Sequence, residues 1–339
     1  MDLFQPIVDE SRFHKNFASI LVPFRKAERD LLKKWSEGFV DRDGKLVKEF
    51  QTSFNSSFWE IYLHAVFKEY GFSIDWSNST PDFSVNANGC EIIVEAVTAN
   101  SAHEKTNEWD KNFSDDEIKV LKSFKKLNRE AIIRISSAIL NKSKKFDKTY
   151  KNLNHVKGKP FVLAVAPFEQ PHFNLQYNRP IKALLYDYYV DEDIYLENPE
   201  KFPNGPPAIN LSYVEKDNGT EIPLGIFNDS NMSEISAIIF SCTATWGKLS
   251  AIAVNSATNT QVISIWATPP DGVPEIRQCS PLEHNESILD GLQIFHNPFA
   301  DYPLEPEVFR AERVVQLYCD TKTGGGYMTE MPMLYFFVR

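Results

Sequence analysis

The chain has 339 residues, of which 42% are apolar and 24% are charged, and its formal net charge is −10. This balance excludes a disordered chain and a collagen-like repeat, and it supplies enough apolar residues for a sizeable core. Because no run of about 18 or more apolar residues occurs, we expect no membrane-spanning helix. The first residues, Met1 to Pro6, lack the basic and apolar regions of a signal peptide, and the four cysteines are scattered. We therefore expect a cytoplasmic protein with reduced thiols.

Positive charge is concentrated in one stretch of this acidic chain. Residues 111–160 contain 14 Lys and Arg against 5 Asp and Glu, whereas residues 201–339 are acidic throughout. A basic face on an acidic protein is the electrostatic footprint expected for a polyanion such as DNA. A plain solvated helix face is the alternative interpretation of the same charges.

Helical and extended patterns alternate through the first half of the chain. One helix is expected over about residues 23–38, and a second from about Ser56 to Tyr70, ended by Gly71. The second is apolar on two sides, so we expect it to be buried. Short strands are expected at 72–76, 82–85 and 90–97, the last two joined by a tight hairpin loop. A long basic helical region at 115–151 precedes a continuously apolar run at 161–166, which is typical of a central strand covered on both faces.

The second half is less regular. We expect a helix at 178–191, an irregular insertion at 197–223, and strands at 237–242, 250–254 and 262–267, followed by short segments near 310–319 and 332–338. The element order predicts an α/β fold with a mixed sheet flanked by helices. The weakest joints lie near 45 and 268. We therefore expect an N-terminal helical extension (1–44), a core (45–267) and a C-terminal extension (268–339).

Three carboxylates near the start of the predicted sheet are candidates for a metal site. Glu60 lies inside the buried helix, Asp82 follows Pro81 at the start of a strand, and Glu95 lies late in the next strand. An isolated buried charge is costly, so a carboxylate among apolar residues must be paired, protonated or bound to metal. Two carboxylates from adjacent strands can bind Mg²⁺, which keeps several waters, and a third from the helix can bind it directly or through water.

Each acid also has a simpler interpretation. Asp82 can start a turn, as aspartates often do after proline. Glu95 can be a half-exposed strand residue paired with a nearby base. Glu60 can form a pair with His64, four residues along the same helix.

Pro81-Asp82 and Glu95-Ala96-Val97, with 13 residues from Asp82 to Glu95, resemble the motif of the PD-(D/E)XK nuclease superfamily. In that family Pro-Asp at one strand is followed by Asp/Glu-x-Lys at the next. The resemblance covers about residues 50–170 and implies a restriction-endonuclease-like fold. It also implies Mg²⁺- or Mn²⁺-dependent hydrolysis of DNA, with Glu60, Asp82 and Glu95 as catalytic and metal-binding residues.

The sequence departs from that motif at one position, where Val97 replaces the family lysine. Positions 95 and 97 share a face of the strand, so the lysine would lie beside the metal-binding acid. The helix after the strand is the usual source of a relocated base. There, Lys142 lies only about 45° from the centre of the apolar stripe. We expect Lys142 to take the catalytic role of the missing lysine, and the alternative is a packed stem with its ammonium in water.

Two other bases on this helix, Arg134 and Lys145, point more than about 100° away from the apolar stripe. We expect them to contact the DNA backbone, where a base supplies affinity without sequence information. A solvated helix face accounts for them equally well.

The sequence thus predicts a metal-dependent endonuclease that hydrolyses DNA phosphodiester bonds, with a homodimer suited to cleavage of both strands. The alternative is a catalytically inactive nuclease-fold module that binds DNA, or that binds a partner protein through the acidic C-terminal region. The feature that discriminates them is whether a lysine reaches the Asp82–Glu95 pair.

Overall fold

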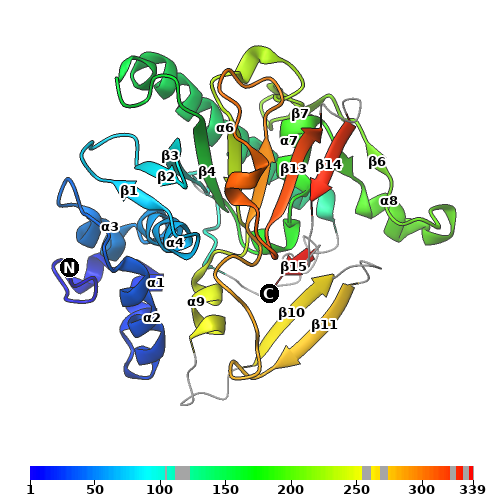
Figure 1. Cartoon of the computed structure of the whole chain (residues 1–339). Helices are drawn as coiled ribbons and strands as arrows, with labels where there is room; N and C mark the ends of the chain where they lie inside the picture. The colour runs from blue at the N-terminus through cyan, green and yellow to red at the C-terminus, as the bar shows by residue number, and fades with distance from the viewer. Residues whose placement is uncertain are drawn as a thin grey trace.

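The computed structural model describes residues 1–103, 105–110, 123–253, 261–267, 274–320, 326–330 and 336–338. An eight-stranded mixed sheet forms its centre, and helices flank that sheet (Figure 1). In spatial order the strands are β1 (Ser73–Asp75), β2 (Phe83–Ala87), β3 (Cys90–Asn100), β4 (Phe161–Phe168), β9 (Ala237–Phe240), β12 (Gln293–His296), β13 (Val315–Asp320) and β14 (Gly326–Glu330). The predicted α/β class is confirmed.

Four helices precede the sheet in the chain and gather beside its β1–β3 end (Figure 1). They are α1 (Lys15–Leu21), α2 (Lys26–Ser36), α3 (Leu46–Thr52) and α4 (Asn55–Glu69). The long helix α6 (Phe124–Lys148) connects β3 to β4 and contacts both strands. Residues 115–122 of the predicted basic helical region lie outside the described residues. The remaining described α-helices are α7 (Arg179–Tyr186), α8 (Glu192–Glu197) and α9 (Trp246–Ile252).

Burial of α4 and β4 fixes the centre of the molecule. Eleven of the 15 residues of α4 are buried, as its two apolar sides predict. Every residue of β4 is buried, which requires cover on both faces of the sheet. Trp59 Nε1 donates a hydrogen bond to the carbonyl oxygen of Ala164 at 2.9 Å and so ties α4 to β4. Both α4 and α6 contact β3. Residues of β3 can therefore meet side chains from either helix.

The structure corrects the expected strand at 250–254, because residues Trp246–Ile252 form helix α9. Thr245 caps this helix by accepting a hydrogen bond from the backbone N–H of Gly247. Helix α7 stops at Tyr186, before the expected end at 191, with Asp187 in the left-handed conformation at its C-cap. These differences follow from caps that act locally, whereas apolar patterning alone favoured a longer helix and a strand.

Three short strands lie within the predicted irregular insertion. Strand β5 (Tyr189–Val190) pairs with β6 (Ala208–Ile209), and β7 (Tyr213–Glu215) pairs with β8 (Glu221–Pro223). The strand expected at 262–267 is present as β10 (Val262–Ala267). It pairs with β11 (Pro274–Cys279) and β15 (Phe336–Val338) in a separate three-stranded sheet, drawn below the main sheet in Figure 1.

Residues after 268 complete the main sheet. Strand β12 pairs antiparallel with β9 and parallel with β13, and all four β12 residues are buried. Three strands of the segment expected as a C-terminal extension, β12, β13 and β14, therefore belong to the central sheet. Across the parts of the chain that the structure describes, no helix combines the length and apolar character needed to cross a bilayer.

A buried acid directly after β4 gives a testable dependence of stability on pH. Glu169 is 1% exposed, and burial raises its pKa from 4.5 to about 7. Between those pH values the folded chain holds a proton that the unfolded chain has lost, so stability falls as pH rises through this window. At 1.36 kcal/mol per pKa unit, the full penalty is about 3 kcal/mol above pH 7.

The Glu169→Gln variant is expected to remove most of that penalty while keeping the side chain's shape. Urea unfolding is expected to give similar free energies for the variant and wild type at pH 5, and a variant more stable by about 2 kcal/mol at pH 8. The comparison at pH 5 serves as the internal control. A constant difference between the two proteins across this pH range would contradict the assignment.

Candidate active site

Asp82 and Glu95 lie opposite each other on neighbouring strands. In the antiparallel β2–β3 pair Phe83 faces Val94, and the same register continued by one residue sets Asp82 against Glu95. Directly opposed residues point to the same face of a sheet, with Cβ atoms about 4.5–5.5 Å apart. A tight turn at Asn88 and Gly89, both with positive φ, connects the strands and sets this register. The hairpin thus brings together two acids that are 13 residues apart in the sequence.

One side chain, that of Arg42, holds the backbone around Asp82 at three carbonyl oxygens. Arg42 donates a hydrogen bond to the carbonyl oxygen of Asp82 at 2.7 Å, and its other terminal nitrogen contacts the carbonyl oxygens of Asn78 and Pro81. The carboxylate accepts a hydrogen bond from the backbone N–H of Ala96 at 2.8 Å. Arg42 belongs to the segment expected as an N-terminal extension, so that segment contributes directly to the position of the site.

Glu95 is the most buried of the three predicted site acids, and it is 1% exposed. Its Oε1 atom accepts hydrogen bonds from Lys142 Nζ at 2.6 Å, Lys145 Nζ at 3.1 Å and Tyr150 Oη at 2.9 Å. Within the described part of the chain, its Oε2 atom is buried and has no hydrogen-bond partner. One oxygen of Glu95 is therefore fully used by the protein, and the other presents an unused acceptor.

The two lysines reach Glu95 from successive turns of α6. Lys142 lies where its position near the apolar stripe predicts, and its side chain is 22% exposed. Lys145 is 47% exposed and also lies over the ring of Tyr150, with Nζ 4.8 Å from the ring centroid. The expected direction of Lys145 away from the sheet is wrong, because residues three apart on a helix are surface neighbours and a long stem bridges the remaining gap.

A cleft of about 280 Å³ joins these residues to α3 and α4. We call it the carboxylate cleft, and its lining includes Glu49, Glu60, Asp82, Glu95, Lys142 and Lys145, together with Ser56, Trp59 and residues 96–98 of β3. Four acids therefore face two bases. Burial, followed by the charge of Asp82, raises the pKa of Glu60. Burial, followed by the charge of Glu95, raises the pKa of Asp82.

Both raised pKa values have the same physical meaning. Burial and the neighbouring negative charges both disfavour ionisation of these two carboxyl groups. A bound cation would relieve the repulsion between the charges. His64, the alternative partner considered for Glu60, instead contacts the carbonyl oxygen of Trp35 at 2.8 Å. Val97 lines the cleft, so it lies on the same face of β3 as Glu95, as expected. Its side chain supplies no charge.

The donor set of the cleft fits a hard divalent cation with few protein ligands. Among the residues that the structure describes, no three His, Cys, Asp or Glu side chains come close enough together to form a metal cage. Mg²⁺ does not need one, because it is usually held by one or two carboxylates and retains several waters. Asp82 and Glu95 supply two carboxylates, and the unpartnered Glu95 Oε2 is an oxygen suited to that role.

The remaining predicted DNA-contact residue lies at the edge of this region. Arg134 donates from Nε to the carbonyl oxygen of Asn100 at 2.8 Å, at the end of β3. Other bases of the basic stretch also have protein partners, including Arg129 with Asp217 and Lys159 with Glu91. The basic stretch is thus partly neutralised by the protein itself.

Sequence patterns did not reveal three of the residues that build the site. Tyr150 begins the 3-10 turn η3 (Tyr150–Asn152) just after α6, where helical periodicity no longer predicts direction. Burial raises its pKa, so it is held as a hydrogen-bond donor to Glu95. Glu49 lies on the short helix α3, and Arg42 lies in an irregular segment. The position of each depends on tertiary packing, and we find no local signal for it.

Comparison with known proteins identifies no relative. No family model, curated protein or solved structure matches this chain.

Proposed function

We propose that the carboxylate cleft is the active site of a metal-dependent endonuclease that hydrolyses DNA, built on a restriction-endonuclease-like fold. The observation that carries the proposal is the convergence of Asp82, Glu95 and Lys142, three residues expected together from the sequence. The element order supports it as well. Helix α4 with Glu60 is followed by the three antiparallel strands β1–β3, then by α6 and the parallel strand β4.

In this proposal Asp82 and Glu95 would hold Mg²⁺ or Mn²⁺, and Glu60 would position a water beside them. When bound, the metal would supply Lewis-acid polarisation of the phosphodiester and activation of a water. Lys142 would neutralise charge that develops on the phosphate, the role of the lysine that Val97 replaces. Its side chain is only 22% exposed, and partial removal from solvent strengthens the interaction of a charge with a nearby anion. Arg134, at the end of β3, would contact the backbone of the bound strand.

The direct experiment is nicking of supercoiled plasmid by the purified full chain. We expect the supercoiled plasmid to be converted to open circles in Mg²⁺ or Mn²⁺ and to stay supercoiled in EDTA. Without a cation the two carboxylates provide no Lewis acid to polarise the phosphodiester. The Glu95→Gln variant, purified identically, controls for a contaminating nuclease. Binding of DNA in EDTA with no cleavage in any metal would favour the inactive binding module and would contradict the enzyme.

The two lysines are expected to differ in their effect on cleavage. Lys142→Ala is expected to lower the nicking rate about 100-fold, because Lys142 makes the shorter contact and is the less exposed. Lys145→Ala is expected to lower it less than about 10-fold. Rates are measured under the same Mg²⁺ concentration, with circular dichroism as the control for folding. A larger loss for Lys145→Ala than for Lys142→Ala would reverse the assignment.

A further inference from the structure

A second cavity lies on the other side of the α4 N-terminus. Its volume is about 310 Å³, at the lower end of the range for small-molecule pockets. Phe168, the last residue of β4, lines it, as does the segment that connects β9 to α9. These two strands are parallel neighbours, and open α/β sheets bind ligands outside the carboxyl ends of such strands.

Aromatic side chains are the largest group among the 13 residues that line this second cavity. We call it the aromatic cavity, and six aromatic residues line it: Phe54, Phe58, Trp109, Phe168, Phe173 and Trp246. Its described lining includes no Lys, Arg or His, and its one charged residue is Glu108. An anion such as a phosphate is therefore disfavoured here, whereas an uncharged planar ring with hydrogen-bonding edges is well matched.

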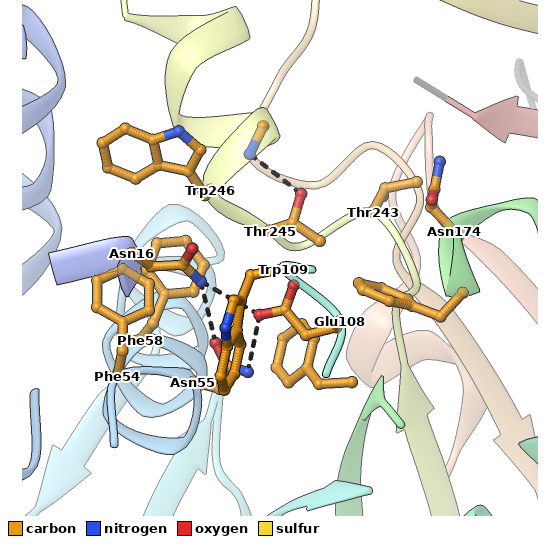
Figure 2. A pocket seen from close by; sticks show the side chains of 13 residues that line it. Asn16, Phe54, Asn55, Phe58, Glu108, Trp109, Asn174, Thr243, Thr245 and Trp246 are labelled. Carbon is orange, nitrogen blue, oxygen red and sulfur yellow. Dashed lines mark hydrogen bonds between the residues drawn. The ribbon is translucent and has the colours of Figure 1, made fainter. Parts of the chain in front are cut away.

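Polar groups are fixed at one side of the aromatic cavity. Glu108 Oε1 accepts hydrogen bonds from Asn16 Nδ2 at 3.2 Å and from Asn55 Nδ2 at 3.0 Å. Trp246 and Thr245 lie across the space from Asn16, Trp109 and Glu108 (Figure 2). The Trp246 ring is held from outside by the guanidinium of Arg25, 5.4 Å from the ring centroid. A flat ligand thus meets π faces together with polar side chains at one side of the cavity.

The aromatic cavity and the carboxylate cleft share the first turns of α4. Asn55 and Phe58 line the cavity, whereas the residues that follow each of them, Ser56 and Trp59, line the cleft. A helix with its side chains is about 10–12 Å across. A strand whose phosphate lies in the cleft can therefore place a base in the cavity.

We propose that the aromatic cavity binds one nucleobase of the strand that the carboxylate cleft holds. The inference rests on the proposed nuclease function for the identity of the ligand. It goes further by assigning a base-binding subsite to residues outside the carboxylate cleft. Stacking on aromatic side chains gives such a site its affinity.

Two tryptophans in the cavity wall allow a direct test without metal. The probes are the four deoxynucleosides, titrated into the full chain in EDTA while tryptophan fluorescence is recorded, with inorganic phosphate as the anion control. Trp246→Ala removes one stacking ring. Phe24→Ala is the matched control, because Phe24 also stacks on Arg25 with a centroid distance of 5.4 Å but does not line the cavity.

We expect saturable binding of at least one nucleoside to wild type and to Phe24→Ala, and binding roughly 5- to 150-fold weaker in Trp246→Ala. Phosphate is expected not to compete. Absence of nucleoside binding, equal losses in the two variants, or competition by phosphate would overturn the base-binding assignment. The Glu95→Gln variant separates this test from the nuclease proposal, because it is expected to bind nucleosides like wild type whether or not the cleft cleaves DNA.

Discussion

The Glu95→Gln variant is expected to lose Mg²⁺-dependent cleavage by at least about 1000-fold. A bound metal contributes several kcal/mol of charge stabilisation in such reactions, and each 1.36 kcal/mol is tenfold in rate. Glutamine preserves the shape of the side chain but removes the charge that Lys142, Lys145 and the metal would share. The rate of conversion of supercoiled plasmid to open circles measures the loss.

Glu91→Gln is the matched control on the same strand. Glu91 lies four residues before Glu95 on the same face of β3, and it also pairs with a lysine, Lys159, at 2.8 Å. Its side chain is 61% exposed, so the change is expected to leave cleavage within about twofold of wild type. Cleavage by Glu95→Gln at the rate of the Glu91→Gln control would remove Glu95 from the mechanism.

The Lys248→Met variant is expected to lower the free energy of unfolding by about 3–5 kcal/mol. Lys248 and Glu286 form an ion pair at 2.7 Å with both side chains fully buried. The same ammonium donates to the carbonyl oxygens of Ser287 and Asp290 at 3.0 and 2.9 Å. Removing it takes the lysine's charge away from the buried Glu286 carboxylate, which keeps its contact with His284 Nε2 at 2.9 Å. It also takes a donor from two buried carbonyl oxygens.

Lys26→Met gives the comparison for this effect. Lys26 forms an ion pair with Asp30 one turn along α2, and its side chain is 78% exposed. Such exposed pairs contribute little to stability, so this variant is expected to unfold at nearly the same urea concentration as wild type. Urea unfolding at pH 7 measures the free energy of unfolding of both variants. The double variant Lys248→Met, Glu286→Gln is expected to recover part of the loss, because it also removes the charge of the buried Glu286 carboxylate. Equal stability of the two single variants would contradict the role of the buried pair.

Local patterns predicted the centre of the site well. The tight hairpin loop fixes the register of β2 and β3, so the spacing from Asp82 to Glu95 already implies that the two acids are opposed. Helical periodicity predicted that Lys142 is directed toward the sheet, and its contact with Glu95 at 2.6 Å agrees. Residues that belong to one hairpin or to one helix face are constrained by their own element, which is why sequence alone could place them.

Contacts between distant segments were not predictable in the same way. Arg42 and Glu49 reach the site from elements whose packing on α4 and β2 has no periodic signature. Strand β12 enters the sheet between β9 and β13, although more than 50 residues separate it from β9 in the chain. The aromatic cavity collects side chains from five segments, including Asn16, Trp109 and Trp246. Such convergence depends on the topology of the whole sheet, which local propensity does not encode.

The most direct test of a metal site between Asp82 and Glu95 is a crystal of the protein soaked in Mn²⁺, with the anomalous difference density measured at the manganese edge. We expect a single strong peak in the carboxylate cleft, in contact with the Asp82 carboxylate and with Glu95 Oε2, a buried oxygen that has no hydrogen-bond partner among the described residues. Density absent from the cleft, with Asp82 and Glu95 in the positions described here, would contradict it.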